Sequence, residues 1–116
     1  MLDLTLKTET LPDETAIVSV AGELDMCTSP SLKQELAAAL ESGAERVIVD
    51  LSRCEFLDSS AIAVLLTTRA RLEDKMKLIL VATDRNILMF FHITGLDRVF
   101  RIEPTIPTPQ LHAISA

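Results

Sequence analysis

Apolar and polar residues alternate at the start of the chain. Leu2, Leu4 and Leu6 are separated by polar residues, and this period of two predicts a half-exposed strand at the edge of a sheet. Residues 11–14 have the composition of a turn, and the β-branched, mostly apolar run 16–21 follows them. We therefore predict that a β-hairpin opens the domain.

Three later stretches repeat apolar residues at the helical spacing of three and four positions. The first predicted helix has Ser29 as its cap, Pro30 at its first position and Gly43 at its end. The second follows residues 57–60, and the third begins after Thr83 or Asp84 and stops at Gly95. On the second and third helices, the residues expected on the buried side are Ile62, Leu65, Leu66, Leu72, Ile87, Leu88 and Phe91.

Two short runs lie between these helices and predict buried strands, namely the strongly β-prone residues 46–51 and the almost entirely apolar residues 78–82. Residues 96–102 form a short apolar return to the core that includes a possible last strand, and residues 111–114 could form one last helical turn. Strands that alternate with helices imply right-handed crossovers and parallel pairing. We therefore predict a single α/β domain over residues 1–116, with a mixed, mostly parallel β-sheet, an N-terminal β-hairpin and three to four helices.

The composition excludes several classes of function. The chain has 11 Lys and Arg against 17 Asp and Glu, a net charge of −6, and neither Trp nor Tyr. Nucleic-acid binding needs cations for the phosphates and aromatic rings for the bases, so both features disfavour it. No apolar stretch reaches the ~20 residues of a membrane span. The two cysteines, Cys27 and Cys54, form no disulfide framework and suit a reducing compartment, so we expect a cytoplasmic domain.

Two hydroxyl residues stand at the beginning of the second predicted helix, in the stretch 56–61, Phe-Leu-Asp-Ser-Ser-Ala. Free backbone N–H groups and the positive end of the helix dipole meet there, so a phosphoryl group on Ser60 would be stabilised locally. Capping of the helix by Asp58 or Ser59 accounts for the same residues. The two interpretations are compatible, because capping by one residue leaves the next hydroxyl unused.

A second group of polar residues is expected on the same edge of the molecule. The sequence Gly-Glu-Leu-Asp, which ends at Asp25, follows the second predicted strand. In a parallel α/β sheet the carboxyl ends of the strands share an edge with the starts of the following helices. We therefore expect Asp25, Cys27 and Ser29 on the same edge as Asp58 and Ser60, although ordinary turn formation also accounts for them.

Catalytic and metal sites have little support in the sequence. His92 and His112 lack the spacing of metal ligands, and a nucleophilic triad would need a histidine near Ser59 or Ser60. His92 is expected to be a packed or surface histidine. The isolated glycines exclude a phosphate-binding loop. We therefore expect no enzyme activity, no cofactor and no metal ion.

Taken together, three motifs resemble those of the STAS domain family, in particular its bacterial anti-sigma factor antagonists. They are Gly-Glu-Leu-Asp at 22–25, Val-Asp-Leu at 49–51 and Phe-Leu-Asp-Ser-Ser-Ala at 56–61. The order of strands and helices matches that family from Leu4 to about Ile114. The acidic-Ser-Ser motif between a strand and an apolar helix is the most specific of the three.

This resemblance implies a binding protein in a partner-switching circuit. The unphosphorylated form would bind an anti-sigma factor that is also a serine kinase, and the sigma factor would be released to RNA polymerase. The kinase would use ATP to phosphorylate Ser60, with Ser59 as a fallback acceptor, and a phosphoserine phosphatase would reset the system. The residues expected to face the partner are Asp25, Cys27, Ser29, Asp58, Ser59, Ser60 and Ala61.

Ala61 departs from the family, which usually has glycine at this position. Its methyl group is expected to restrict the approach of the kinase to the acceptor backbone. Because Ala is the better helix former, the acceptor is also expected to be held more rigidly.

Other functions remain open at this point. A STAS domain can also serve as a scaffold in a stressosome-type assembly or in a transport complex. A two-component receiver domain has a similar size, but it requires an acidic pair after its first strand and a lysine after its last strand. This chain lacks both features. A small serine hydrolase would require the missing nearby histidine.

Overall fold

An antiparallel hairpin opens the computed structural model, which describes residues 4–107. It consists of β1 (Leu4–Leu11) and β2 (Thr15–Leu24), paired from Leu4 opposite Gly22 to Leu11 opposite Thr15. In the turn, Glu14 adopts a left-handed φ of 64°, and its N–H donates to the Leu11 carbonyl at 3.2 Å. The predicted hairpin is therefore confirmed.

Three more strands extend the sheet parallel to β2, namely β3 (Arg46–Leu57), β4 (Leu78–Val81) and β5 (Arg101–Glu103). The spatial order is β1-β2-β3-β4-β5, the same as the order along the chain. This confirms the mixed, mostly parallel sheet. It also excludes the receiver alternative, whose doubly wound sheet has the order 2-1-3-4-5.

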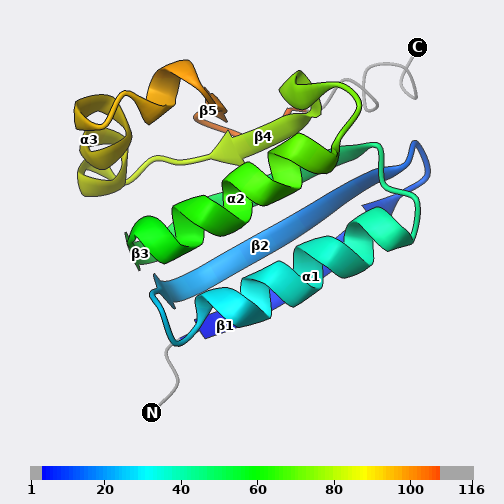
Figure 1. Ribbon diagram of the computed structural model, residues 1–116, viewed down its shortest axis with the longest axis horizontal. Coiled ribbons are helices and arrows are strands. Elements are labelled where there is room, and N and C mark those ends of the chain that lie inside the picture. The colour runs from blue at the N-terminus through cyan, green and yellow to red at the C-terminus, as the bar shows by residue number, and fades with distance from the viewer. Residues whose placement is uncertain (1–3, 108–116) are drawn as a thin grey trace.

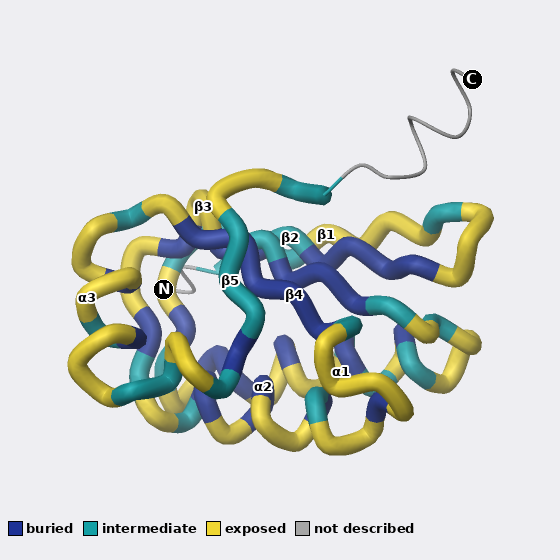
Figure 2. The backbone as a smooth tube through the Cα atoms, turned by 90° about the horizontal axis from the view of Figure 1, so that it is seen from above, coloured by how far each residue is buried: buried dark blue, intermediate teal, exposed yellow. Residues whose placement is uncertain are grey.

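The helices α1 (Ser29–Glu41) and α2 (Ser59–Arg71) lie side by side on one face of the sheet (Figures 1 and 2). The third helix, α3 (Arg85–Ile93), follows β4 and lies at the carboxyl end of the strands (Figure 1). Short 3-10 turns precede β4 and β5, at Lys75–Lys77 and Leu96–Arg98. The three α-helices agree with the expected number, and the turn expected at 111–114 lies outside the described residues. No helix between residues 4 and 107 is long and apolar enough to cross a membrane.

The main core lies between the sheet and the helices. Its fully buried side chains include Leu32 and Leu36 of α1, Leu65 of α2 and Phe91 of α3. A smaller apolar cluster occupies the opposite face of the sheet. There Ile48 lies between Ile17 and Ile79 on the neighbouring strands, and the three are joined by Leu11, Val81 and Ile106.

Strands β2 and β3 both continue beyond the ends predicted for them, which were residues 21 and 51. Polar residues such as Ser52 and Arg53 interrupt the apolar run and indicated the end of the strand. Their backbone groups nevertheless continue the ladder with β2, and the pairing reaches Leu24 opposite Leu57. Buried backbone polar groups need hydrogen-bond partners, so the two strands extend as far as each provides such partners for the other.

The helices differ from expectation in two respects. Ser29 is the first residue of α1 and is buried, while Thr28 occupies the N-cap position without a side-chain capping bond. Leu66 and Leu88, expected to face the core, are 40% and 36% exposed. Each is adjacent to a buried residue, Leu65 or Ile87, and a helix turns by about 100° per residue, so Leu66 and Leu88 lie at the margin of the buried face.

Leu65 and Leu66 provide a test of the packing of α2 on the sheet. Replacing the fully buried Leu65 by Ala should lower the free energy of unfolding by about 2–5 kcal/mol, because it leaves a cavity. The matched variant Leu66→Ala should change it by less than about 1 kcal/mol, because most surface substitutions are small. Urea unfolding measures both. Equal losses for the two variants would contradict this packing.

Candidate functional site

The pairing of β2 with β3 sets the position of the site. The two strands end together at Leu24 and Leu57, and the N–H of Asp58 donates to the Leu24 carbonyl at 3.1 Å. The loop into α1 and the start of α2 therefore leave the sheet at the same edge. We call this edge, residues 24–29 and 56–61, the carboxyl rim. As predicted, it brings the segment with Asp25 beside the segment with Ser60.

Asp58 caps α2 and also binds the expected phosphoacceptor. Its Oδ1 accepts the backbone N–H of Ser60 at 2.9 Å and the hydroxyl of Ser60 at 2.5 Å. Of the two capping residues that the sequence allowed, Asp58 is therefore the one used. Ser60 is half-buried, whereas Ser59 is exposed.

Ser29 contacts the same hydroxyl from the other helix. The two oxygens, Ser29 Oγ and Ser60 Oγ, are 3.0 Å apart. The Ser29 residue is only 3% exposed, because the start of α1 packs beside the start of α2. Ser29 therefore lies within the carboxyl rim and not on its surface, where it was expected to face a partner.

Asp25 organises the loop before α1. Its carboxylate accepts the backbone N–H groups of Cys27 and Thr28, at 2.9 and 3.0 Å, and the Thr28 hydroxyl at 3.1 Å. These hydrogen bonds, first of all that from the Thr28 backbone, hold the pKa of Asp25 below its ordinary value. Turn formation, the simpler interpretation of this segment, is thus part of the role of Asp25.

Ala61 is fully buried and belongs to the main core. Its methyl group therefore packs under the first turn of α2 and does not extend from the carboxyl rim. The expectation that this methyl would obstruct an approaching kinase is wrong, because the helix turns residue 61 away from the exposed side that carries Ser59.

Sequence reasoning missed two exposed apolar side chains on the carboxyl rim. Met26 is 77% exposed and Phe56 is 48% exposed. Phe56 faces outward because β3 has an extra residue between Cys54 and Phe56, which pair with the adjacent residues Gly22 and Glu23. Such a bulge reverses the alternation of a strand, and the apolar pattern contained no sign of it.

The two cysteines are free, as expected, but their surroundings differ. Cys27 is exposed on the carboxyl rim. Cys54 is buried, and its thiol donates to the carbonyl of Phe56 at 3.2 Å. Burial raises the pKa of the Cys54 thiol, so the protonated form is favoured there.

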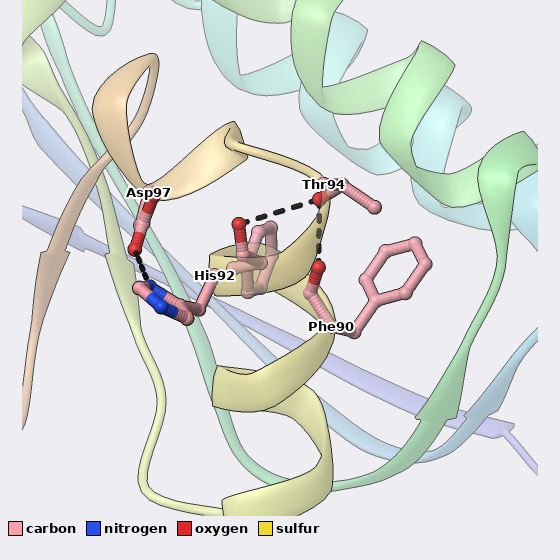
Figure 3. A network of polar contacts seen from close by, with 5 residues as sticks. Phe90, His92, Thr94 and Asp97 are labelled. Atoms are coloured by element: carbon pink, nitrogen blue, oxygen red, sulfur yellow. Dashed lines mark hydrogen bonds and ion pairs between the residues drawn. The ribbon is translucent and has the colours of Figure 1, made fainter.

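His92 takes part in a separate network at the end of α3 (Figure 3). Its Nδ1 lies 3.0 Å from Asp97 Oδ2, while the Thr94 hydroxyl donates to the Phe90 carbonyl at 2.7 Å. The side chain of His92 is 76% exposed. It is therefore a surface histidine, one of the two roles expected. The hydroxyl of Ser60 has its hydrogen bonds with Asp58 and Ser29, and not with His92.

The fold and the motif-bearing carboxyl rim together define a class of protein. The family model described as Mlab, STAS domain matches residues 8–104. The chain therefore belongs to the STAS domain family.

The similar proteins indicate the group within the family. The anti-sigma-B factor antagonist of Staphylococcus aureus is 32% identical over 103 residues, which are 87% of this chain and 94% of that protein. A crystal structure of an anti-sigma factor antagonist from Mycobacterium paratuberculosis is 33% identical, with a TM-score of 0.81, and the match covers 97% of this chain and 95% of that one. Within the STAS family, the chain belongs with the anti-sigma factor antagonists.

A more distant structure has the same fold. SpoIIAA of Bacillus, solved in its phosphorylated form, is 20% identical with a TM-score of 0.65, and the match covers 97% of this chain and 100% of that one. At this identity the likeness concerns the fold alone.

The lowered pKa of Asp25 predicts how the loop responds to pH. A group whose pKa is lower in the folded state stabilises that state when it is ionised. The stability advantage of the wild type over Asp25→Asn should be constant above about pH 5 and should be lost as the pH falls below the ordinary pKa of an aspartate, about 4, and through the lowered pKa of Asp25. Urea unfolding at several pH values measures it.

Glu23→Gln, which removes an exposed carboxylate two residues earlier, is the matched control for charge alone. An advantage of the wild type over Asp25→Asn that does not change with pH would contradict the role of the ionised Asp25.

Proposed function

We propose that this protein is a cytoplasmic anti-sigma factor antagonist whose binding is switched by phosphorylation of Ser60. The unphosphorylated form binds an anti-sigma factor that is also a serine kinase, and the bound sigma factor is released. The kinase then transfers a phosphoryl group from ATP to Ser60, and binding ends. A phosphoserine phosphatase restores the binding form.

One observation carries this proposal, namely the position of the Ser60 hydroxyl in the first turn of α2, on the carboxyl rim. The start of a helix presents backbone N–H groups and the positive end of the dipole, and both stabilise a phosphate. Asp58 would continue to cap the helix through the Ser60 N–H after the hydroxyl is modified. The names of the relatives support the antagonist role, and a phosphorylated form of SpoIIAA, which shares this fold, supports a phosphorylated state.

The contacts of Ser60 explain how a phosphoryl group would end binding. Phosphorylation removes the proton that Ser60 donates to Asp58 and adds a charge of about −1.5 to −2 next to that carboxylate. The added bulk also stands between Asp58 and Ser29, where only a hydroxyl fitted. The charge and the bulk change the surface that the partner contacts, while the core of the domain lies on the other side of α2.

The exposed apolar side chains of the carboxyl rim complete the proposed contact. Met26 precedes α1 and Phe56 precedes α2, so they lie on the two segments that Asp58 and Leu24 join. Burial of large apolar side chains supplies much of the energy of a protein contact, and charged groups around it supply specificity. The anti-sigma factor would therefore contact Met26 and Phe56, and also Ser60, whose hydroxyl lies between the Ser29 hydroxyl and the Asp58 carboxylate.

Phosphorylation can be tested in a lysate of the source organism with ATP and Mg²⁺. Mass spectrometry should find an acid-stable phosphoserine at position 60 of the wild type, and none at that position in Ser60→Ala. Ser60→Asp should bind the captured anti-sigma factor at least about tenfold more weakly than the wild type, a loss of about 1.4 kcal/mol.

Ser60→Ala should retain binding, because it adds neither charge nor bulk, and Ser59→Asp is the control for a charge at the neighbouring position. Tight binding by Ser60→Asp, or phosphorylation confined to another residue, would refute the proposed switch.

The apolar contact has its own test. Met26→Ser should weaken binding of the unphosphorylated protein by more than about 1 kcal/mol, because the large exposed side chain of Met26 is lost from the proposed contact. Met76→Ser is the matched control, since Met76 is 54% exposed but lies before β4, at the opposite end of the strands. Surface plasmon resonance with the captured partner measures both. Equal effects of the two variants would place the interface elsewhere.

A further inference from the structure

The hydrogen bonds of Ser60 define which group donates to which. A serine hydroxyl has one proton and two lone pairs. The proton of Ser60 is donated to Asp58 Oδ1. In the contact with Ser29, 3.0 Å away, the oxygen of Ser60 is therefore the acceptor and Ser29 is the donor.

Ser29 is held firmly enough to orient this oxygen. It is the first residue of α1, its exposed fraction is 3%, and the next residue is Pro30, which restricts the backbone. Its own N–H donates to the Asp25 carbonyl at 2.8 Å. The loop that Asp25 organises thus places the Ser29 hydroxyl against Ser60.

We infer that Ser29 is a positioning residue for the phosphorylation of Ser60, an inference that rests on the proposed function. The O–H bond of Ser60 points to Asp58, and one lone pair of Ser60 Oγ accepts the hydrogen bond from Ser29. The remaining lone pair of Oγ is therefore free to attack the γ-phosphorus of ATP. As the bond between Oγ and phosphorus forms, the bond from phosphorus to the bridging oxygen breaks and ADP leaves with that electron pair. The proton of Ser60 passes to Asp58.

The same arrangement explains the selection between two adjacent serines. Ser59 is exposed, and the structure gives its hydroxyl no hydrogen bond within the described residues. A side chain without hydrogen bonds samples several rotamers. A reaction is much faster when the reacting atom is fixed in the attacking geometry. Ser29 therefore favours Ser60 over the otherwise more accessible Ser59.

The test uses the full chain, as wild type and as Ser29→Ala, Ser29→Thr and Ser31→Ala, in a lysate of the source organism with ATP and Mg²⁺. The initial rate of phosphorylation is measured against the concentration of the added protein, and the phosphorylated site is mapped. Ser31→Ala is the matched control, because Ser31 is an exposed serine in the same first turn of α1.

Ser29→Ala should lower the maximal rate at Ser60 by about tenfold to a hundredfold, leave the half-saturating concentration within about twofold, and raise the share of phosphate on Ser59. Ser29→Thr, which keeps the hydroxyl, should restore the preference for Ser60, and Ser31→Ala should resemble the wild type. A loss of packing alone would not move phosphate to Ser59.

The possible failures are distinguishable. Unchanged rate and site in Ser29→Ala, with a wild type that is phosphorylated on Ser60, would overturn the role of Ser29 and leave the proposed function standing. A wild type without phosphate on Ser60 would overturn both.

Discussion

The parallel pairing of β2 with β3 is the constraint on which the rest of this structure depends. Because the two strands end together, at Leu24 and Leu57, α1 and α2 must begin next to each other on the same edge of the sheet. The hydrogen bond from Asp58 to the Leu24 carbonyl holds the two loops at that point. A serine from each helix can then meet there, although 31 positions separate Ser29 from Ser60 in the sequence.

This geometry lets a small chemical change act at one place. The hydroxyl of Ser60 lies between the Asp58 carboxylate and the Ser29 hydroxyl, so the negative charge of a phosphate on Ser60 would be placed directly next to Asp58. The core below, with Ala61 and Leu65 fully buried, is separated from that change by the helix itself. A protein with this arrangement can change what it binds without changing its fold. In that respect it suits partner switching.

The sequence predicted the architecture well, because the signals for it are local. The hairpin, the order of the elements, the glycine after α1 and the neighbourhood of Asp25 and Ser60 all follow from periodicity, turn residues and the rule for parallel strands. It could not predict the bulge of β3 between Cys54 and Phe56, which depends on pairing with β2 and turns Phe56 outward. It placed Ser29 near Ser60 but could not show their contact, because the meeting of two side chains depends on helix packing.

A local switch on the carboxyl rim can be measured directly. Phosphoserine can be installed at position 60, and the amide signals of the modified and unmodified proteins compared by two-dimensional NMR. Chemical-shift changes should be confined to residues 24–30 and 56–63, and the amide signals of β1, β4 and β5 should be unchanged. Shifts spread through the whole sheet, or no change at the start of α1, would contradict it.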